Sequence, residues 1–353
     1  MVVRNTTTRG EPTELLVYDT WSENSMNSPL SLTEGPLAQR AWTCQERILS
    51  PRILHFTDQQ LFWEWREVIR AEERVQSSEN SSGWYPPLTH IVRNLIRERG
   101  SRFDRLISWC YDVLHELYSS RQLTRNSDRL PAISGIARLL QDGDDMTYLA
   151  GLWKEELQFG LYWCVKERAP RSLSNPAPSW SWTSFETQIC WWMSVYSRMP
   201  PAEFVVNHHS VELAGQDEFG AVNAASLNLT GRMCKIQIVL HPGGQNNPHD
   251  YHGEDEGDWS SELLDMQGIP LGAANLDRLP DTEDIFAFLL AVAPSVDAER
   301  WEEWELLLIT PVSGSATFER IGIGEVSDNI YRDPPLDIPS WIAMLETHII
   351  DLV

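Results

Sequence analysis

Glu46 is the residue whose sequence context most clearly allows chemistry, because Trp42 precedes it by four positions in the stretch RAWTCQERILSPRILHF, residues 40–56. Positions i and i+4 share one face of a helix, so the indole and the carboxylate would point the same way. A carboxylate beside an indole is partly desolvated and can serve a reaction with an oxocarbenium-like transition state, such as cleavage of a glycosidic bond. The alternative is an ordinary helix residue whose carboxylate pairs with Arg40 or Arg52.

The stretch HPGGQNNPHDYHGEDEGDWS, residues 241–260, brings together residue types that bind metal. His249 and His252 stand beside several Asp and Glu residues, and imidazole and carboxylate groups are common ligands of divalent cations. A metal site also needs rigid surroundings, and a segment this rich in Gly and Asn offers none. We therefore interpret the segment as a solvated surface loop and expect neither a metal nor a cofactor.

The composition argues against nucleic acid as a partner. The 353 residues include 28 Lys and Arg but 51 Asp and Glu, which gives a formal net charge of -23. Such a field repels phosphate backbones. The five cysteines are widely spaced and form no C-x-x-C pair, which is typical of reduced thiols in a cytoplasmic protein. No segment approaches a run of about 18 apolar residues, so no membrane span is predicted.

The elements that would position Glu46 are a helix and the hairpin that follows it. Apolar residues recur at helical spacing over 37–49, and Ser50-Pro51 ends the helix because the residue before a proline disfavours helical backbone. Two apolar runs at 53–56 and 61–65, separated by a short turn, predict a β-hairpin. The helix and the hairpin would therefore lie next to each other.

Helical spacing continues through the middle of the chain. It predicts one or two helices over 87–120, a helix with an apolar stripe over 133–140 preceded by Asp128 as its N-cap, and a further helix over 148–163. Residues 71–84 are polar and predict a loop. The small residues Ser134-Gly135 are interpreted as packing residues rather than as part of a nucleophile elbow.

Beyond about residue 176 the apolar period changes to two, which is typical of β-strands. Strands are predicted at 204–213, 226–240, 285–293, 304–312 and 317–326, and a short helix or strand at 341–353. These strands are expected to close one antiparallel core with Trp180 or Trp182 inside it. Large rings at regular spacing are typical of core, and the alternative is a surface that stacks a ligand.

The longest motif resembles a known family. Residues 40–52 (RAWTCQERILSPR), followed by LHF at 54–56 and QLFWE at 60–64, are similar to the last conserved block of the fungal heterokaryon incompatibility (HET) domain. Shorter stretches that resemble the family's region after this domain are DRLPAISGIA at 128–137, YLAGLW at 148–153, PSWSW at 178–182, LNLTGR at 227–232 and FERIG at 318–322. The resemblance covers most of residues 36–326.

The resemblance implies an α+β fold in three parts. Residues 1–70 would be the C-terminal remnant of a HET domain similar to the Toll/interleukin-1 receptor (TIR) fold, formed by a helix plus a β-hairpin. Residues 71–170 would form a helical region, and residues 171–353 an antiparallel β-rich C-terminal domain. The change of period places the last boundary near residues 165–178.

The resemblance also implies a role in fungal non-self recognition (allorecognition) and programmed cell death, carried out through contacts with other proteins of the incompatibility system. The family's two upstream blocks are not found before residue 36, so we expect an N-terminally truncated form without catalysis. Glu46 would then lie on a partly exposed helix face, with Arg40 or Arg52 as its nearest charged group.

The alternative is an enzyme. Some relatives with the TIR fold cleave NAD with a Glu in a W-x-x-x-E helix, and Trp42 and Glu46 match that spacing. Glu46 would be the catalytic carboxylate, Trp42 would support it, and NAD would be the substrate.

Overall fold

The chain combines a few short helices with many strands, and an antiparallel sheet dominates it. A computed structural model describes residues 2–6, 12–16, 35–56, 61–65, 68–71, 101–141, 145–169, 171, 176–191, 200–240, 261–294, 302–327 and 338–353. Three expectations concern residues outside this description: the metal ligands His249 and His252, the predicted loop 241–260 around them, and the start of the predicted helical segment 87–120.

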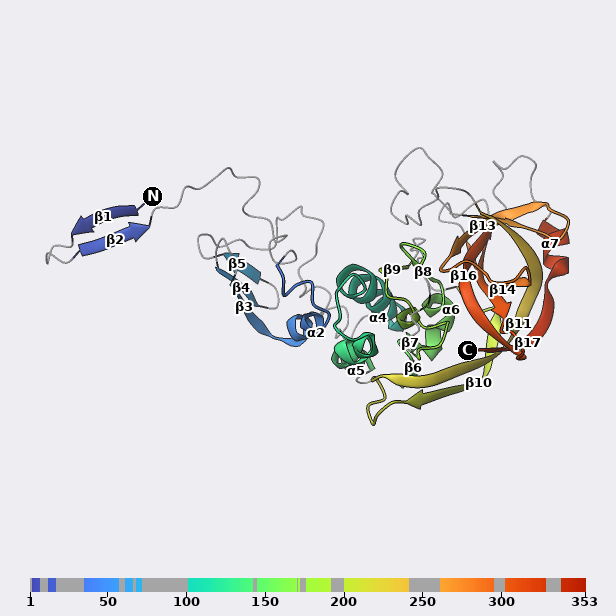
Figure 1. Ribbon diagram of the computed structural model, residues 1–353, viewed down its shortest axis with the longest axis horizontal. Coiled ribbons are helices and arrows are strands. Elements are labelled where there is room, and N and C mark those ends of the chain that lie inside the picture. Colours follow the sequence, from blue (N-terminus) through green and yellow to red (C-terminus); the bar gives the residue numbers. More distant parts are fainter. Residues whose placement is uncertain are drawn as a thin grey trace.

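The largest element is a sheet of eight strands in the C-terminal part of the chain (Figure 1). Its strands are β10 (Phe204–Leu213), β11 (Val222–Leu240), β12 (Ser261–Leu264), β13 (Pro270–Leu276), β14 (Ile285–Pro294), β15 (Glu302–Pro311), β16 (Thr317–Ser327) and β17 (Glu346–Leu352). The order β11-β12-β13-β16-β15-β14 returns to β11, which pairs with β14, so these strands form a closed ring. All pairs are antiparallel except the short contact of β16 with β17.

The period-two pattern predicted this sheet well. The expected strand 204–213 coincides with β10, and the other four predicted strands fall on β11, β14, β15 and β16. β11 begins at Val222 rather than at residue 226. The tail contains both of the expected alternatives, because helix α7 (Ile338–Met344) precedes β17. Trp341 of α7 packs edge-on against Trp304 of β15.

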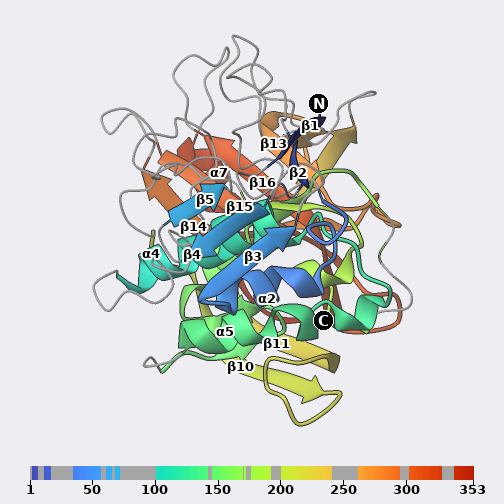
Figure 2. The same cartoon turned by 90° about the vertical axis from the view of Figure 1, so that its left-hand side faces the viewer.

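The N-terminal part contains a short helix and a small sheet. Strands β1 (Val2–Thr6) and β2 (Pro12–Leu16) pair with each other, and helix α2 (Trp42–Leu49) precedes β3 (Arg52–Phe56), β4 (Leu61–Trp65) and β5 (Val68–Ala71). The predicted helix and hairpin are therefore present, although the helix begins at Trp42 because residues 36–39 form a turn. Figure 2 looks onto the outer face of the β3–β4–β5 sheet, with the helices behind it.

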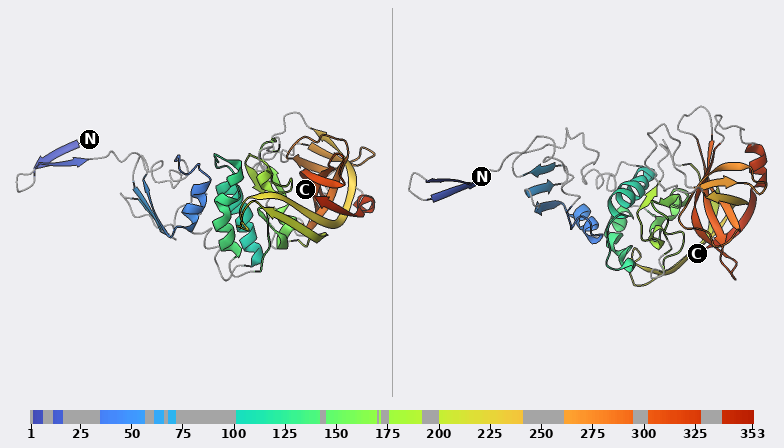
Figure 3. Two further views of the ribbon diagram at one scale, coloured as in Figure 1. Left: turned by 60° about the horizontal axis from the view of Figure 1, so that its bottom comes forward. Right: turned by 45° about the horizontal axis from the view of Figure 1, so that its top comes forward.

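A set of short elements links the two sheets, and both views of Figure 3 show it between them. These elements are α4 (Arg102–Ile107), the π-helix η2 (Ser108–Tyr118), η3 (Asn126–Asp128), η4 (Pro131–Ile133), α5 (Ser134–Gln141), β6 (Tyr148–Leu149), β7 (Leu152–Trp153), η5 (Lys154–Glu156), α6 (Leu157–Gly160), β8 (Trp163–Val165), η6 (Trp182–Ser184) and β9 (Ile189–Trp191). α4 starts with a capping box formed by Ser101 and Asp104. Asp128 does not cap α5 as predicted, because it belongs to η3.

The predicted helix over 148–163 is wrong. β6 and β7 form a hairpin in which Tyr148 pairs with Trp153, and the two turn residues, Ala150 and Gly151, have φ of 46° and 102°. Such angles suit a two-residue hairpin turn and interrupt a helix. Almost every residue of this segment is buried. Apolar residues therefore stand at most positions, and their match to helical spacing does not indicate a helix here.

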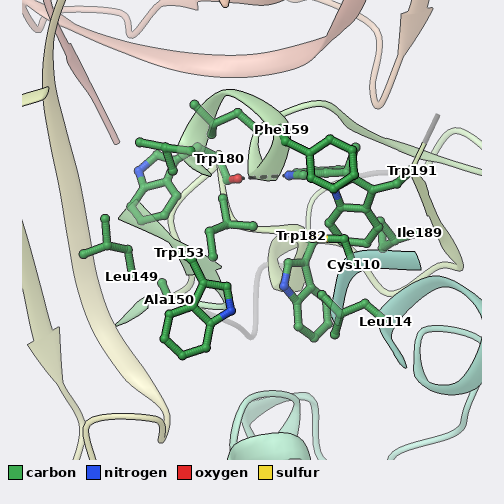
Figure 4. Packing of buried hydrophobic residues seen from close by; sticks show 14 of the residues in the cluster. Cys110, Leu114, Leu149, Ala150, Trp153, Phe159, Trp180, Trp182, Ile189 and Trp191 are labelled. Carbon is green, nitrogen blue, oxygen red and sulfur yellow. Dashed lines mark hydrogen bonds between the residues drawn. The ribbon is translucent and has the colours of Figure 1, made fainter. Parts of the chain in front are cut away.

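The tryptophans of the middle region form core rather than a ligand-stacking surface. Trp153, Trp180, Trp182 and Trp191 are all buried and pack against aliphatic side chains (Figure 4). Two indole N–H groups of this region also bond to the backbone. The Nε1 atom of Trp163 donates to the carbonyl oxygen of Trp180 at 3.1 Å, and Nε1 of Trp182 donates to that of Gly151 at 3.1 Å.

Residues from both sides of the boundary expected near residues 165–178 share one apolar core. β8 and β9 stand on either side of this stretch and pair with each other, with Cys164 opposite Cys190. One apolar core contains residues of α2, of the middle region and of the large sheet. The division into domains stays a prediction. In the described part of the chain, no helix is both long and apolar enough to cross a membrane.

Candidate functional site

Helix α2 places Trp42 and Glu46 on its outer side. Glu46 is exposed and Trp42 is 38% exposed, so neither side chain is enclosed. The indole Nε1 of Trp42 donates to Oδ2 of Asp128 at 3.4 Å and thus ties α2 to η3. The expected ion pair of Glu46 with Arg40 or Arg52 is not formed within the described residues. The partly exposed helix face was predicted correctly, and an arginine as the nearest charged group of Glu46 stays a prediction.

The carboxylate that is buried in this region is Glu64 on β4. Strand pairing sets Ile53 opposite Glu64 and His55 opposite Phe62, so these four side chains share the inner face of the hairpin. The Oε2 atom of Glu64 lies 2.7 Å from Nε2 of His55 and 3.0 Å from Nε of Arg47. Arg47 belongs to α2, so the carboxylate joins the helix to both strands.

The surroundings of Glu64 keep its carboxylate ionised. Burial by itself raises the pKa of Glu64, but hydrogen bonds and charge from His55 and Arg47 outweigh it and leave the pKa below its ordinary value. An ionised carboxylate only accepts hydrogen bonds, so Nε2 of His55 carries the proton that it donates to Glu64. In neutral His55 the other ring nitrogen, Nδ1, is then an acceptor.

This arrangement fixes the imidazole of His55 in one tautomer beside the ion pair of Glu64 and Arg47. A carboxylate–histidine pair of this kind can orient a general base, but the Glu64 oxygen that accepts both bonds is committed to its partners. The simplest consequence is mechanical, because the cluster of Arg47, His55 and Glu64 holds α2 against the hairpin. Sequence reasoning did not select these residues. Their signal was the placement of His55 and Glu64 at inward positions of a hairpin whose other inward residues are apolar.

A second contact fixes the opposite side of α2. The side-chain oxygen of Gln45 accepts a hydrogen bond from the backbone N–H of Gly135 at 3.1 Å. A Cβ atom on Gly135 would stand 2.8 Å from Cδ1 of Leu49, closer than real Cβ contacts. Gly135 therefore allows the close packing of α5 on α2, as the interpretation of Ser134-Gly135 as packing residues predicted.

The outer face of the hairpin is apolar and open. Leu54 lies directly opposite Trp63, and the neighbouring pair on this face is Phe56 with Leu61. Leu54 is 45%, Trp63 42% and Phe56 78% exposed. We call the set of Leu54, Phe56 and Trp63 the hairpin face. Large apolar side chains gathered on one surface mark interaction sites more often than scattered ones do.

Two further observations bear on this site, and neither assigns a function to it. No family model, curated protein or solved structure matches this chain. Among the residues that the structure describes, no three His, Cys, Asp or Glu side chains gather as a metal site would require.

Proposed function

We propose that this chain is a HET-family protein of fungal non-self recognition and programmed cell death, and that it acts through protein contacts of the hairpin face. Arg47, His55 and Glu64 belong to the stretch that resembles the last HET block, and they hold that stretch together as one helix–hairpin unit. In this proposal the unit is the C-terminal part of a TIR-like domain. It works in the cytoplasm with other proteins of the incompatibility system.

The observation that carries the proposal is the exposure of Leu54, Phe56 and Trp63 on one side of a sheet whose other side is joined to α2 through Glu64 and Arg47. A sheet with helices on both sides would bury these residues. Within the described residues one layer covers only the inner side. The outer side is thus suited to receive the apolar surface of another protein, which would remove these side chains from water.

A second candidate function is cleavage of NAD by Glu46. It is favoured by the one-turn spacing of Trp42 and Glu46 on α2, where both side chains reach the surface. The exposure of Glu46 favours the first function, because a carboxylate that cleaves a glycosidic bond works in an enclosed pocket that excludes water.

The proposed function is tested by inducible expression of the chain in a filamentous fungus, with colony viability as the readout. We expect the wild-type chain to reduce viability, and Phe56→Ser and Trp63→Ser to restore it. Both side chains are exposed, so their replacement costs little stability, about 0.5 kcal/mol or less.

Two control variants distinguish the hairpin face from the rest of the surface and from catalysis. Ile349 on β17 is 70% exposed and lies outside the hairpin, so Ile349→Ser removes a comparable apolar side chain elsewhere. Glu46→Ala removes the candidate carboxylate. Both variants should remain as toxic as the wild-type chain. A wild-type chain without effect on viability, or hairpin-face variants as toxic as wild type, would refute the proposal.

A further inference from the structure

Arg129 carries a buried positive charge that forms no ion pair with a carboxylate of the described residues. The residue as a whole is 6% exposed. One of its terminal nitrogens donates to the carbonyl oxygen of Thr187 at 3.1 Å, while its Nε has no hydrogen-bond partner in the described part of the chain. No described carboxylate lies within 4.0 Å of the guanidinium. Buried charges in proteins are normally paired, because an unpaired one loses its hydration without compensation.

The aromatic ring nearby compensates this charge only in part. The Cζ atom of Arg129 lies 6.0 Å from the ring centroid of Trp182, at the outer limit of a cation–π contact. Burial lowers the pKa of Arg129, although Tyr118 and Glu186 act in the other direction. The guanidinium stays protonated at neutral pH. Among the described residues, the charge of Arg129 is therefore compensated only in part.

Arg129 also lines a cavity of about 130 Å³. One water molecule takes roughly 30 Å³ of liquid, so the cavity has room for a group of several heavy atoms. Its lining includes the buried Thr183 and, at the rim, the exposed Ser127 and Asn223, so it can be reached from the surface. Hydroxyl and amide groups of this kind donate hydrogen bonds to oxyanions.

We propose that this cavity binds an oxyanion group, a phosphate or a carboxylate, against the guanidinium of Arg129. A planar guanidinium presents paired N–H donors that match the oxygens of either group. The bound anion would supply a countercharge to the guanidinium. None of the residues that line this cavity belongs to α2 or the hairpin, and the inference does not depend on the proposed function.

The test is a thermal melt of the purified chain titrated with sodium phosphate or with sodium acetate, at an ionic strength held constant with sodium chloride. Binding to the folded state raises the melting temperature saturably, on the order of 2–5 °C at ten times the dissociation constant. A response to phosphate alone assigns a phosphate group, and a response to acetate alone assigns a carboxylate. No saturable rise with either anion overturns the proposal.

Variants separate a specific site from general salt effects, since phosphate stabilises many proteins by exclusion from their surface. Arg129→Met should abolish the saturable rise. Arg138→Met removes an exposed arginine that pairs with Asp217, and it should respond like the wild type. A saturable rise in Arg129→Met equal to that of Arg138→Met would overturn the proposal.

A second pair of variants keeps the test decisive if Arg129→Met does not fold. Ser127 is exposed at the rim, so Ser127→Asp and Ser127→Asn add side chains of nearly equal size that differ in charge. Asp should weaken anion binding several-fold relative to Asn, because it places a like charge beside the ligand. Equal anion affinities in the two variants would contradict a site in this cavity.

Discussion

Nε2 of His55 lies 2.7 Å from Oε2 of Glu64, and this contact connects the inner faces of two paired strands beneath helix α2. The same oxygen accepts from Arg47 on α2. The carboxylate that organises the helix–hairpin unit is therefore Glu64, whereas the carboxylate selected by its spacing from a tryptophan, Glu46, is exposed. The two residues are predicted to respond differently to the same substitution.

Glu64→Gln should lower the free energy of unfolding by about 1–3 kcal/mol at pH 7, because it removes the charge from two buried hydrogen bonds. Glu46→Gln, the same substitution at an exposed position, should change it by about 0.5 kcal/mol or less. Urea denaturation of both variants measures these values. Equal effects of the two substitutions would contradict the role given to Glu64.

The contribution of Glu64 should disappear in acid. Its pKa in the folded chain lies below the ordinary value of 4.5, so its contribution to stability is complete above pH 4.5 and is lost as the pH falls through the folded-state pKa. The difference in unfolding free energy between wild type and Glu64→Gln should therefore be largest at neutral pH and shrink below pH 4.5. Denaturation series at several pH values check this, and a difference that grows with acidity would oppose it.

Gly151→Ala should destabilise the chain by about 2–4 kcal/mol, which combines backbone strain with overpacking. Gly151 has φ of 102°, and an added Cβ would stand 2.5 Å from Nε1 of Trp182. Gly215→Ala is the matched control, since a Cβ there meets no atom within 4 Å. The midpoint of urea denaturation should fall for Gly151→Ala only. A similar midpoint for both variants would argue against the tight turn between β6 and β7.

Asp277→Asn should lower the unfolding free energy by about 3–5 kcal/mol, because it leaves a buried arginine without its countercharge. Asp277 and Arg320 are fully buried and form an ion pair at 2.7 Å, and Arg320 also donates to the carbonyl oxygen of Leu161. Asp281→Asn should have little effect, because the Asp281 carboxylate is exposed and its partner Arg278 also pairs with Glu319. Equal thermal stabilities of the two variants would contradict the buried link between β16 and the middle region.

The sequence pattern predicted elements in which buried and solvated side chains alternate. It missed elements in which every side chain is buried. Residues 204–213 alternate between packed and solvated positions, so their period identified β10. Residues 148–153 are buried on every side, so no period distinguished a hairpin from a helix there. The glycine of Ala150-Gly151 was the local signal for a turn between two short strands.

The site was predicted in part. Spacing alone identified helix α2 and the shared face of Trp42 and Glu46, because both follow from local geometry. It did not identify the partners of these residues. Trp42 donates to Asp128, which lies 86 positions away, and Glu64 collects Arg47 and His55 from separate elements. Such contacts depend on how helix and hairpin pack, which a single sequence does not specify.

Nicotinamide release from NAD most directly tests the claim that this chain acts through its surface rather than by catalysis. The purified wild-type chain and the Glu46→Ala variant are incubated with NAD, and free nicotinamide is followed over time against a protein-free sample. The exposure of Glu46 predicts no release above that background from either protein. Sustained release by the wild-type chain that is abolished in Glu46→Ala would contradict the claim and establish Glu46 as a catalytic carboxylate.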